Sequence, residues 1–316
     1  MNETAQNSSP KWIVVLKAIL IPCLAYATWQ AVNYIVQYAA IYLFSLYAVR
    51  RNPSADSATL NQIVSDLFYR NISMLYLAAA LLLAIILYLI ERKIHFTHMI
   101  NINRRKLGGE LVAASLAIGT FLGIFFNSFL NLIGERLPEK WMQENQESVD
   151  AFNGGSTFVA LLATVIAAPI VEELLFRGFI YNALKKIMNT LPNHLNAISH
   201  RISIFLSALI TSVLFGIYHG NILQALYAGI ISFVMIWLYE QSGSLLANIL
   251  FHGAFNFSGI FTAMASAAFG YKLTAVFSVI IALMLMVATG IACKRKNCAD
   301  IDTSVSYTHL RAHETG

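Results

Sequence analysis

Three ionisable side chains interrupt a strongly apolar part of the chain. Glu172, Glu173 and Arg177 follow a run, residues 157–171, that contains no ionisable residue. A carboxylate at the centre of a bilayer costs at least ~2.5–3.5 kcal/mol, so charges inside a membrane helix indicate a function. Glu173 and Arg177 are four residues apart, the spacing at which an acid and a base meet on one helix face. The spacing predicts that Arg177 neutralises Glu173 and leaves Glu172 available for chemistry.

Two further polar groups follow on later apolar stretches. His219 comes four residues after Phe215, and Asn256 comes four residues after His252. Polar residues recur at this spacing from 244 to 256, which predicts one polar helix face that must meet protein or water. A carboxylate, two imidazoles and an amide suit hydrolysis. The carboxylate acts as a base toward water, and the other groups stabilise an oxyanion or hold a metal.

Three short motifs therefore follow one another on predicted membrane helices. They are Glu-Glu-x-x-x-Arg at 172–177, Phe-x-x-x-His at 215–219 and His-x-x-x-Asn at 252–256. Together they resemble the CPBP intramembrane proteases, which include the CAAX prenyl endopeptidases and the bacteriocin-processing and immunity (Abi) proteins. The resemblance covers about residues 157–261.

This resemblance implies a role for each matching residue. Glu172 is expected to activate the water that attacks a peptide bond, and Glu173 and Arg177 are expected to support it. The site is expected to be completed by His219, His252 and Asn256. The implied function is that of an intramembrane endopeptidase acting on a membrane-associated protein or peptide.

The need for a metal stays open at this point, because the family's chemistry has been described both with and without one. If a divalent metal such as zinc is bound, its expected ligands are Glu172, His219 and His252. The two histidines are each followed by glycine and lie on separate predicted helices, and the chain lacks His-Glu-x-x-His. A metal-free mechanism is therefore favoured, and no cofactor-binding residue is assigned.

The composition indicates a membrane protein. Of the 316 residues, 58% are hydrophobic and 12% are charged, whereas soluble domains carry roughly 25% charged residues. We expect an all-α polytopic fold with about eight transmembrane helices and a site within the bundle. The basic residues cluster beside apolar spans, where membrane topology explains them, so no nucleic-acid partner is expected. The expected partners are the lipid bilayer and a peptide or membrane-protein substrate.

The predicted organisation has three parts. Residues 1–11 form a polar tail, residues 12–291 form the transmembrane domain with its catalytic core at about 157–261, and residues 292–316 form a C-terminal tail. The stretch 305–315 resembles the translation of a common sequencing adaptor. We interpret it as an assembly artefact and exclude it from the site.

The order of the spans predicts the topology. The predicted spans are 12–49, 74–90, 111–133, 157–188, 202–218, 224–239, 244–261 and 273–291. An even number of spans places both termini on one side of the membrane. Lysine and arginine are concentrated in the tails and the even-numbered loops, so we expect both termini in the cytoplasm, in a bacterial cytoplasmic membrane.

A non-proteolytic transporter or a peptide-binding scaffold is the alternative, because charges inside the membrane also mark transport pathways. Transporters commonly contain internal repeats with broken helices at matching positions. The two halves of this chain show no such symmetry. The protease interpretation is therefore favoured.

Overall fold

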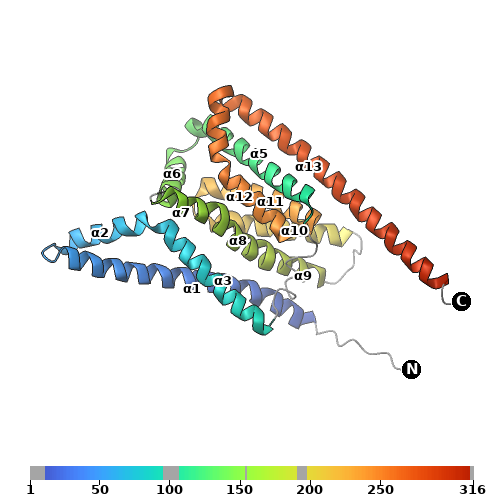
Figure 1. Ribbon diagram of the computed structural model, residues 1–316, viewed down its shortest axis with the longest axis horizontal. Helices are drawn as coiled ribbons and strands as arrows, with labels where there is room; N and C mark the ends of the chain where they lie inside the picture. The colour runs from blue at the N-terminus through green and yellow to red at the C-terminus, as the bar shows by residue number, and fades with distance from the viewer. Residues whose placement is uncertain (1–10, 95–106, 154, 191–197, 314–316) are drawn as a thin grey trace. The chain divides into compact units, whose positions relative to one another are not determined.

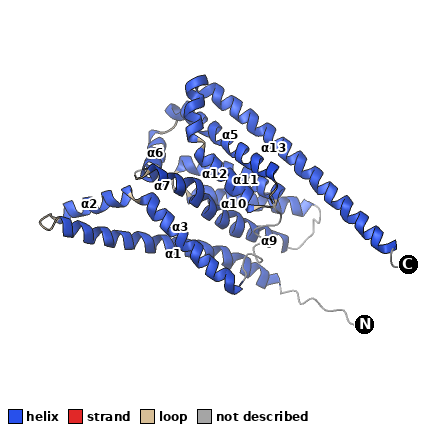
Figure 2. Cartoon of the chain, in the orientation of Figure 1, coloured by secondary structure: helices blue, strands red, loops and turns tan. Residues whose placement is uncertain are grey.

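The structure is a computed structural model, and it describes residues 11–94, 107–153, 155–190 and 198–313. These residues form helices joined by short turns, with no strand among them (Figure 2). The predicted all-α fold is confirmed.

The helices are labelled in Figure 1. In chain order they are α1 (Lys11–Arg51), α2 (Ser57–Arg70), α3 (Ile72–Ile94), α5 (Gly109–Ile133), α6 (Glu139–Asn153), α7 (Thr157–Leu161), α8 (Ala168–Glu173), α9 (Asn182–Thr190), α10 (Ile198–Tyr218), α11 (Ile222–Ser242), α12 (Leu245–Phe257) and α13 (Gly259–His313). A 3-10 turn, η1 (Gly134–Arg136), precedes α6. Two π-helical segments, η2 (Leu162–Ala167) and η3 (Leu174–Tyr181), flank α8.

The chain divides into two compact units. The first contains α1 to α3, η1, α6 to α10 with η2 and η3, and α11 as far as Ile236. The second contains α5, the end of α11, α12 and α13. In the first unit α1 packs against α2, α3, η3 and α9, and in the second α5 packs against α12 and α13.

Seven helices of the described residues are long and apolar enough to cross a bilayer. They cover Val15–Arg51, Ile72–Ile90, Gly109–Arg136, Thr157–Asn189, His200–Tyr218, Ile222–Ser242 and Gly259–Lys294. The polytopic architecture is confirmed, with seven such helices where about eight spans were predicted. The difference arises at the predicted span 244–261. There α12 has only 13 residues, about 20 Å at 1.5 Å per residue, against a hydrocarbon core of ~30 Å.

A break within α13 lies close to the predicted boundary between the last two spans. Gly270 has φ 73° and ψ 155°, which is not helical and lies in the region that glycine adopts most readily. In Figure 1 the orange part of α13 turns sharply before the long straight helix that continues toward the C-terminus. The single apolar stretch Gly259–Lys294 therefore consists of two helical pieces.

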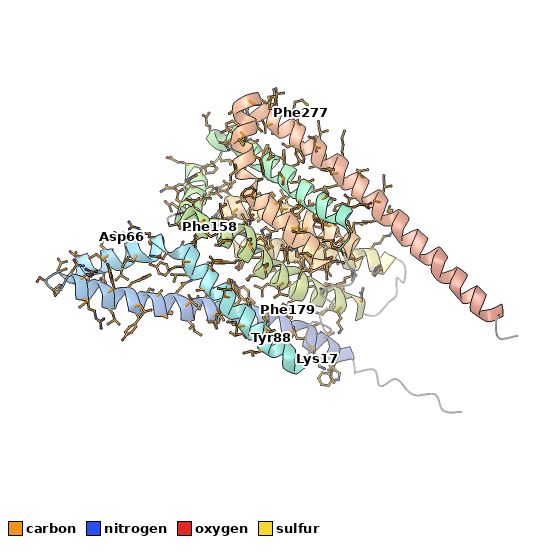
Figure 3. The ribbon with its side chains drawn as sticks, in the orientation of Figure 1. Lys17, Asp66, Tyr88, Phe158, Phe179 and Phe277 are labelled. Atoms are coloured by element: carbon orange, nitrogen blue, oxygen red, sulfur yellow. The ribbon has the colours of Figure 1, made fainter. Side chains whose placement is uncertain are left out.

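Large apolar side chains project from the helices of each unit (Figure 3). Tyr88 is 62% exposed and Phe158 is 68% exposed in the first unit, and Phe277 is 57% exposed in the second. Apolar surface of this extent is unfavourable in water and matches a lipid environment. Together with the seven apolar helices, it identifies an integral membrane protein.

The two longest polar connections of the sequence contain helices. Residues 50–70 hold α2, whose first turn is capped where the Asp56 side chain accepts a hydrogen bond from the Thr59 backbone N–H at 2.8 Å. Residues 134–155 hold α6, which carries acidic side chains and packs against α2, α3 and α7. Both are too polar to span a membrane, so they are surface helices.

Candidate active site

The helix that carries the first motif is not a regular α-helix. Between Thr157 and Thr190 it widens twice into π-helical turns, at η2 and η3. Pro169 explains the first, because proline has no N–H and its ring clashes with a carbonyl one turn back. At the end of η2 the Ala168 N–H bonds to the Ala163 carbonyl, five residues earlier. Such π turns frequently mark functional sites, and here they flank the turn that holds Glu172 and Glu173.

The second π segment is supported by a side chain. The Asn182 amide donates to the carbonyl oxygens of Arg177 at 2.9 Å and Gly178 at 3.1 Å. A π turn displaces the regular hydrogen bonds of these carbonyls, and the Asn182 amide takes their place. The sequence analysis predicted a single helix over 157–188 and did not foresee this irregularity.

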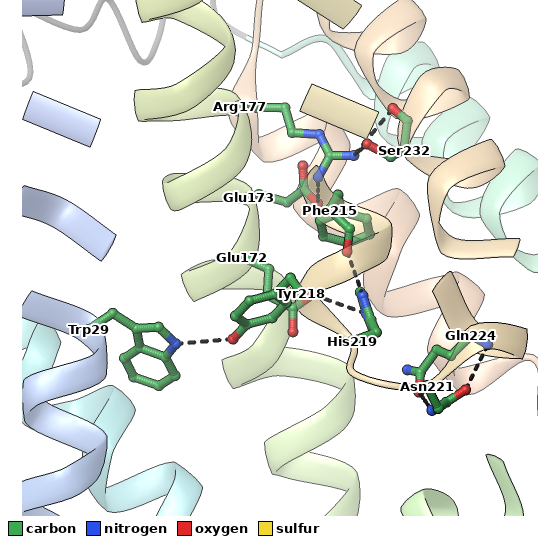
Figure 4. Close-up of polar contacts among 10 residues, drawn as sticks. All are labelled: Trp29, Glu172, Glu173, Arg177, Phe215, Tyr218, His219, Asn221, Gln224 and Ser232. Atoms are coloured by element: carbon green, nitrogen blue, oxygen red, sulfur yellow. Dashed lines mark hydrogen bonds and ion pairs between the residues drawn. The ribbon is translucent and has the colours of Figure 1, made fainter. Parts of the chain in front are cut away.

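Arg177 is the centre of a fully buried polar cluster (Figure 4). Its Nη1 donates to Glu173 Oε1 at 3.0 Å, which is the ion pair that the four-residue spacing predicts. Its Nη2 donates to the carbonyl oxygen and to the Oγ of Ser232 on α11, at 3.2 and 2.9 Å. The guanidinium also lies 4.6 Å from the ring centroid of Phe215 on α10. We call Glu173, Arg177, Phe215 and Ser232 the arginine clamp; it ties three segments of the first unit together.

Glu172 lies about 100° around the helix from Glu173 and is not part of the arginine clamp. It is 7% exposed, and its Oε2 lies 4.0 Å from Nε2 of His219 (Figure 4). This separation is longer than a hydrogen bond and suits two groups bridged by one water molecule. The two residues that the motifs predict as partners therefore face one another.

His219 is held in a tight turn between α10 and α11. Gly220 has φ 79°, a left-handed conformation that glycine adopts without strain, and the Asn221 side chain accepts from the Gln224 N–H at 2.8 Å to cap α11. The imidazole Nδ1 lies 2.8 Å from the Phe215 carbonyl oxygen. Because a carbonyl only accepts, Nδ1 carries the hydrogen, and the ring turns Nε2 toward Glu172.

Two aromatic residues at this site were not predicted. Trp29 of α1 is 1% exposed, and its Nε1 donates to the Tyr218 hydroxyl at 3.0 Å. The Tyr218 ring meets the ring of Phe176 edge-on at 5.3 Å and that of His219 at 5.7 Å. The three motifs specify neither residue, and nothing local in the sequence links two residues that are 189 positions apart.

His252 and Asn256 lie on α12, in the second unit. Ser244, Asn248 and His252, which share the predicted polar face, are 3%, 0% and 5% exposed. Asn256, at the end of this row, is exposed. The polar face is therefore mostly covered by protein, and a common site with Glu172 remains a prediction.

These three motifs lie within one region that matches a known protein family. The match covers residues 154–258, about a third of the chain. The family is the Rce1-like type II CAAX prenyl endopeptidases. The predicted resemblance to CPBP proteases is thereby confirmed over this region, and an intramembrane endopeptidase is supported. No curated protein and no solved structure matches the chain significantly.

The donor set of the Rce1-like region was tested for a metal. Catalytic zinc is typically held by three protein ligands and a water. Among the described residues, no three His, Cys, Asp or Glu side chains gather closely enough to hold a metal ion. Glu172 and His219 supply two donors in the first unit, and the predicted third, His252, belongs to the second. The first unit alone does not fit a catalytic zinc site.

The helix that carries His252 is positioned by two glycines of α5. A side chain at Gly119 would overlap the backbone of Phe251, the residue before His252. A side chain at Gly123 would overlap Ser258 and the Phe255 carbonyl. The spacing Gly-x-x-x-Gly is one by which membrane helices approach closely. This contact sets the position of α12 within its unit.

Replacing Gly119 with alanine is expected to destabilise the Rce1-like region. The added methyl group must push α12 away, and overpacking of this kind costs about 1–3 kcal/mol. The detergent-solubilised variant should unfold several degrees below the wild type in a thermal scan. Gly109→Ala, on the same helix with nothing within 4 Å of the new methyl group, is the matched control. An equal melting temperature for both variants would contradict the close contact.

Proposed function

We propose that the protein is an intramembrane endopeptidase in which Glu172 activates water for attack on a peptide bond. The observation that carries this proposal is the pair of Glu172 and His219, 4.0 Å apart and next to a glutamate already neutralised by arginine. Glu173 stabilises the fold through its ion pair, and Glu172 faces the imidazole of His219. The match to the Rce1-like endopeptidases supports the same assignment.

The proposed chemistry follows from two hydrogen-bond acceptors, the carboxylate of Glu172 and the imidazole of His219. A water between them donates one hydrogen to Glu172 Oε2 and the other to His219 Nε2, so its oxygen lone pairs face a scissile carbonyl. The water proton passes to Glu172, the oxygen bonds to the carbonyl carbon, and the π electrons move to the carbonyl oxygen. When the carbon–nitrogen bond breaks, Glu172 returns the proton to the leaving nitrogen. The products are a carboxylic acid and an amine.

The arginine clamp supports this step without touching the substrate. Arg177 compensates the charge of Glu173, the neighbour of Glu172 in the chain. The guanidinium also fixes α10 and α11 through Phe215 and Ser232. His219 lies on the turn between those two helices, so the clamp positions its imidazole.

His252 and Asn256 are proposed to complete the site from α12. The Asn256 amide can donate to the oxyanion, and the buried His252 can orient it or the substrate. Their support is the motif order within the matched region and the covered polar face of α12. Their roles are expected to appear as lower kcat in His252→Ala and Asn256→Ala, with unchanged thermal stability.

We propose that this reaction needs no metal. Protein purified without added metal is therefore expected to keep its activity after prolonged chelation and dialysis. The reason is that water is activated by Glu172 and His219, which face each other directly. The measurement is the rate of peptide cleavage before and after chelation. Activity that is lost to the chelator and restored by one equivalent of zinc, with no zinc bound by His219→Ala/His252→Ala, would contradict the proposal.

The site is proposed to open toward the face of the membrane that carries α6. The Asn221 amide, two residues after His219, donates to Ser148 of α6 at 3.3 Å, so the turn of His219 lies against that surface helix. With the N-terminus in the cytoplasm, as the positive-inside rule predicts, the three apolar helices before α6 place α6 outside. Substrates would then enter from the external face.

Labelling of single cysteines in a cysteine-free background measures this topology. A reagent that cannot cross membranes, added to intact cells, is expected to label a cysteine at Glu147 on α6 and to miss one at Lys186 on α9. Both side chains are exposed, and the helix containing Glu172 separates them. The reverse pattern would invert the proposed topology.

The function is tested with a panel of synthetic peptides in proteoliposomes. The panel contains membrane-spanning peptides and C-terminally prenylated peptides, each with an unlipidated counterpart. Cleavage of at least one peptide at a single bond, identified by mass spectrometry, is expected. Intact peptides throughout, together with movement of peptide across the vesicle membrane, would favour the transporter alternative instead.

A further inference from the structure

The proposed reaction needs hydrogen-bond donors for the oxyanion, and the arrangement of His219 does not provide one. Its Nδ1 hydrogen is engaged by the Phe215 carbonyl at 2.8 Å, and its Nε2 faces Glu172 Oε2 at 4.0 Å. Both ring nitrogens are therefore committed, one to a backbone carbonyl and one to the side of Glu172, and neither is placed to donate to an oxyanion. Acyl-transfer sites need donors aimed at the oxygen where negative charge develops. The Asn256 amide of α12 is proposed as one such donor, and a second donor in the first unit would share the charge.

The Tyr218 hydroxyl has the required chemistry. The indole N–H of Trp29 only donates, so in their 3.0 Å hydrogen bond the phenol oxygen is the acceptor. The hydroxyl hydrogen of Tyr218 remains available to donate. A hydroxyl that accepts one hydrogen bond also donates a stronger one, because the two bonds polarise each other.

The surroundings hold this phenol next to the reacting groups. Trp29 is 1% exposed and meets the Tyr76 ring edge-on at 5.4 Å, so the donor is fixed in place. The Tyr218 ring is packed between Phe176 and His219 and is itself only partly buried. The close-up draws the Tyr218 ring beside the side chain of Glu172 (Figure 4). The phenol therefore lies next to the carboxylate that is proposed to activate water.

We infer that Tyr218 is a catalytic residue whose hydroxyl donates a hydrogen bond to the oxyanion, and that Trp29 is the positioning residue that orients it. The inference rests on the proposed endopeptidase function. As water bonds to the scissile carbon, the displaced electron pair gathers on the carbonyl oxygen. The Tyr218 O–H stabilises that charge and keeps its proton throughout. When the carbon–nitrogen bond breaks, the carbonyl reforms and the hydrogen bond weakens.

Removing the hydroxyl alone tests the inference. Tyr218→Phe is expected to lower kcat about 10²–10³-fold, as for other oxyanion donors, with KM nearly unchanged. Trp29→Phe keeps a ring but removes the N–H, and is expected to lower kcat less, about tenfold. Because Trp29 acts through Tyr218, the double variant should be no slower than Tyr218→Phe. Tyr69→Phe, on the surface helix α2, deletes an exposed hydroxyl and is the matched control.

A second measurement separates chemistry from packing. A phosphinic peptide mimics the tetrahedral oxyanion, so Tyr218→Phe should weaken its binding by the same factor as kcat while binding of the substrate peptide stays unchanged. Equal losses for both ligands, or kcat like that of the wild type, would overturn the inference. Cleavage by wild type that is absent in Glu172→Gln and normal in Tyr218→Phe would overturn it and leave the proposed function intact. No cleavage by the wild type of any peptide in the panel would overturn both.

Discussion

Replacing Arg177 with methionine is expected to lower the free energy of unfolding by about 3–5 kcal/mol, the typical effect of leaving one partner of a buried ion pair uncompensated. The two side chains of the Glu173–Arg177 pair are 0% exposed and joined at 3.0 Å. The variant would bury the Glu173 carboxylate without its guanidinium and remove the donor to the Ser232 carbonyl. Chemical unfolding in detergent measures this loss of free energy of unfolding. In cells, the same loss would appear as poor insertion of the variant into membranes.

Two variants make this prediction specific. Glu173→Leu/Arg177→Met removes both charges together, and should recover most of the lost stability, because an apolar pair of similar volume is tolerated at buried sites. Lys140→Met breaks an exposed pair with Glu144, 3.7 Å long, and should change stability by less than about 1 kcal/mol. If Arg177→Met were as stable as Lys140→Met, the arginine clamp would not be a structural element.

Replacing Glu172 with glutamine is expected to lower cleavage by at least ~10²-fold, the lower range for loss of a positioned general base. The amide keeps the volume of the side chain but cannot accept the proton of water. Thermal stability should be unchanged, because Glu172 is outside the arginine clamp that holds the helices together. The measurement pairs a cleavage rate with a melting temperature on the same preparation.

The contrast with Glu173 separates the two roles. Glu173→Gln leaves Arg177 buried without an opposite charge, so this variant should lose stability first and activity as a consequence. Glu147→Gln, on the exposed surface of α6, removes an acid outside the site and should change neither property. Complete loss of cleavage in both Glu172→Gln and Glu173→Gln, with unchanged stability in both, would contradict the assignment.

The sequence predicted the contacts that depend on helical spacing. The Glu173–Arg177 pair follows from a four-residue interval, and the structure contains it. The approach of Glu172 to His219 agrees with the site that the order of the motifs predicts. The π turns around this motif were not predicted, although Pro169 carried a signal, because hydropathy describes how apolar a helix is and not how it is wound.

Contacts between segments that are distant in the chain could not be predicted from the sequence. Trp29 and Tyr218 are 189 residues apart, and α1 contains no motif that marks a tryptophan as part of a site. The glycine pair of α5 is different, since Gly119 and Gly123 have the recognised spacing for close helix packing and could have been identified. The span count differed for a geometric reason. The predicted span 244–261 is mostly apolar, but its helix α12 ends at Phe257 after 13 residues, before the turn at Ser258.

The most direct measurement of the central claim is cleavage in water enriched in oxygen-18 by proteoliposomes of wild type and Glu172→Gln, matched for folded protein. The wild type is predicted to yield two complementary fragments, with one heavy oxygen in the new carboxyl group and none elsewhere. Glu172→Gln is predicted to leave the peptide intact while melting at the wild-type temperature. Labelled product formed by Glu172→Gln at the wild-type rate would contradict the assignment of Glu172 as the base that activates water.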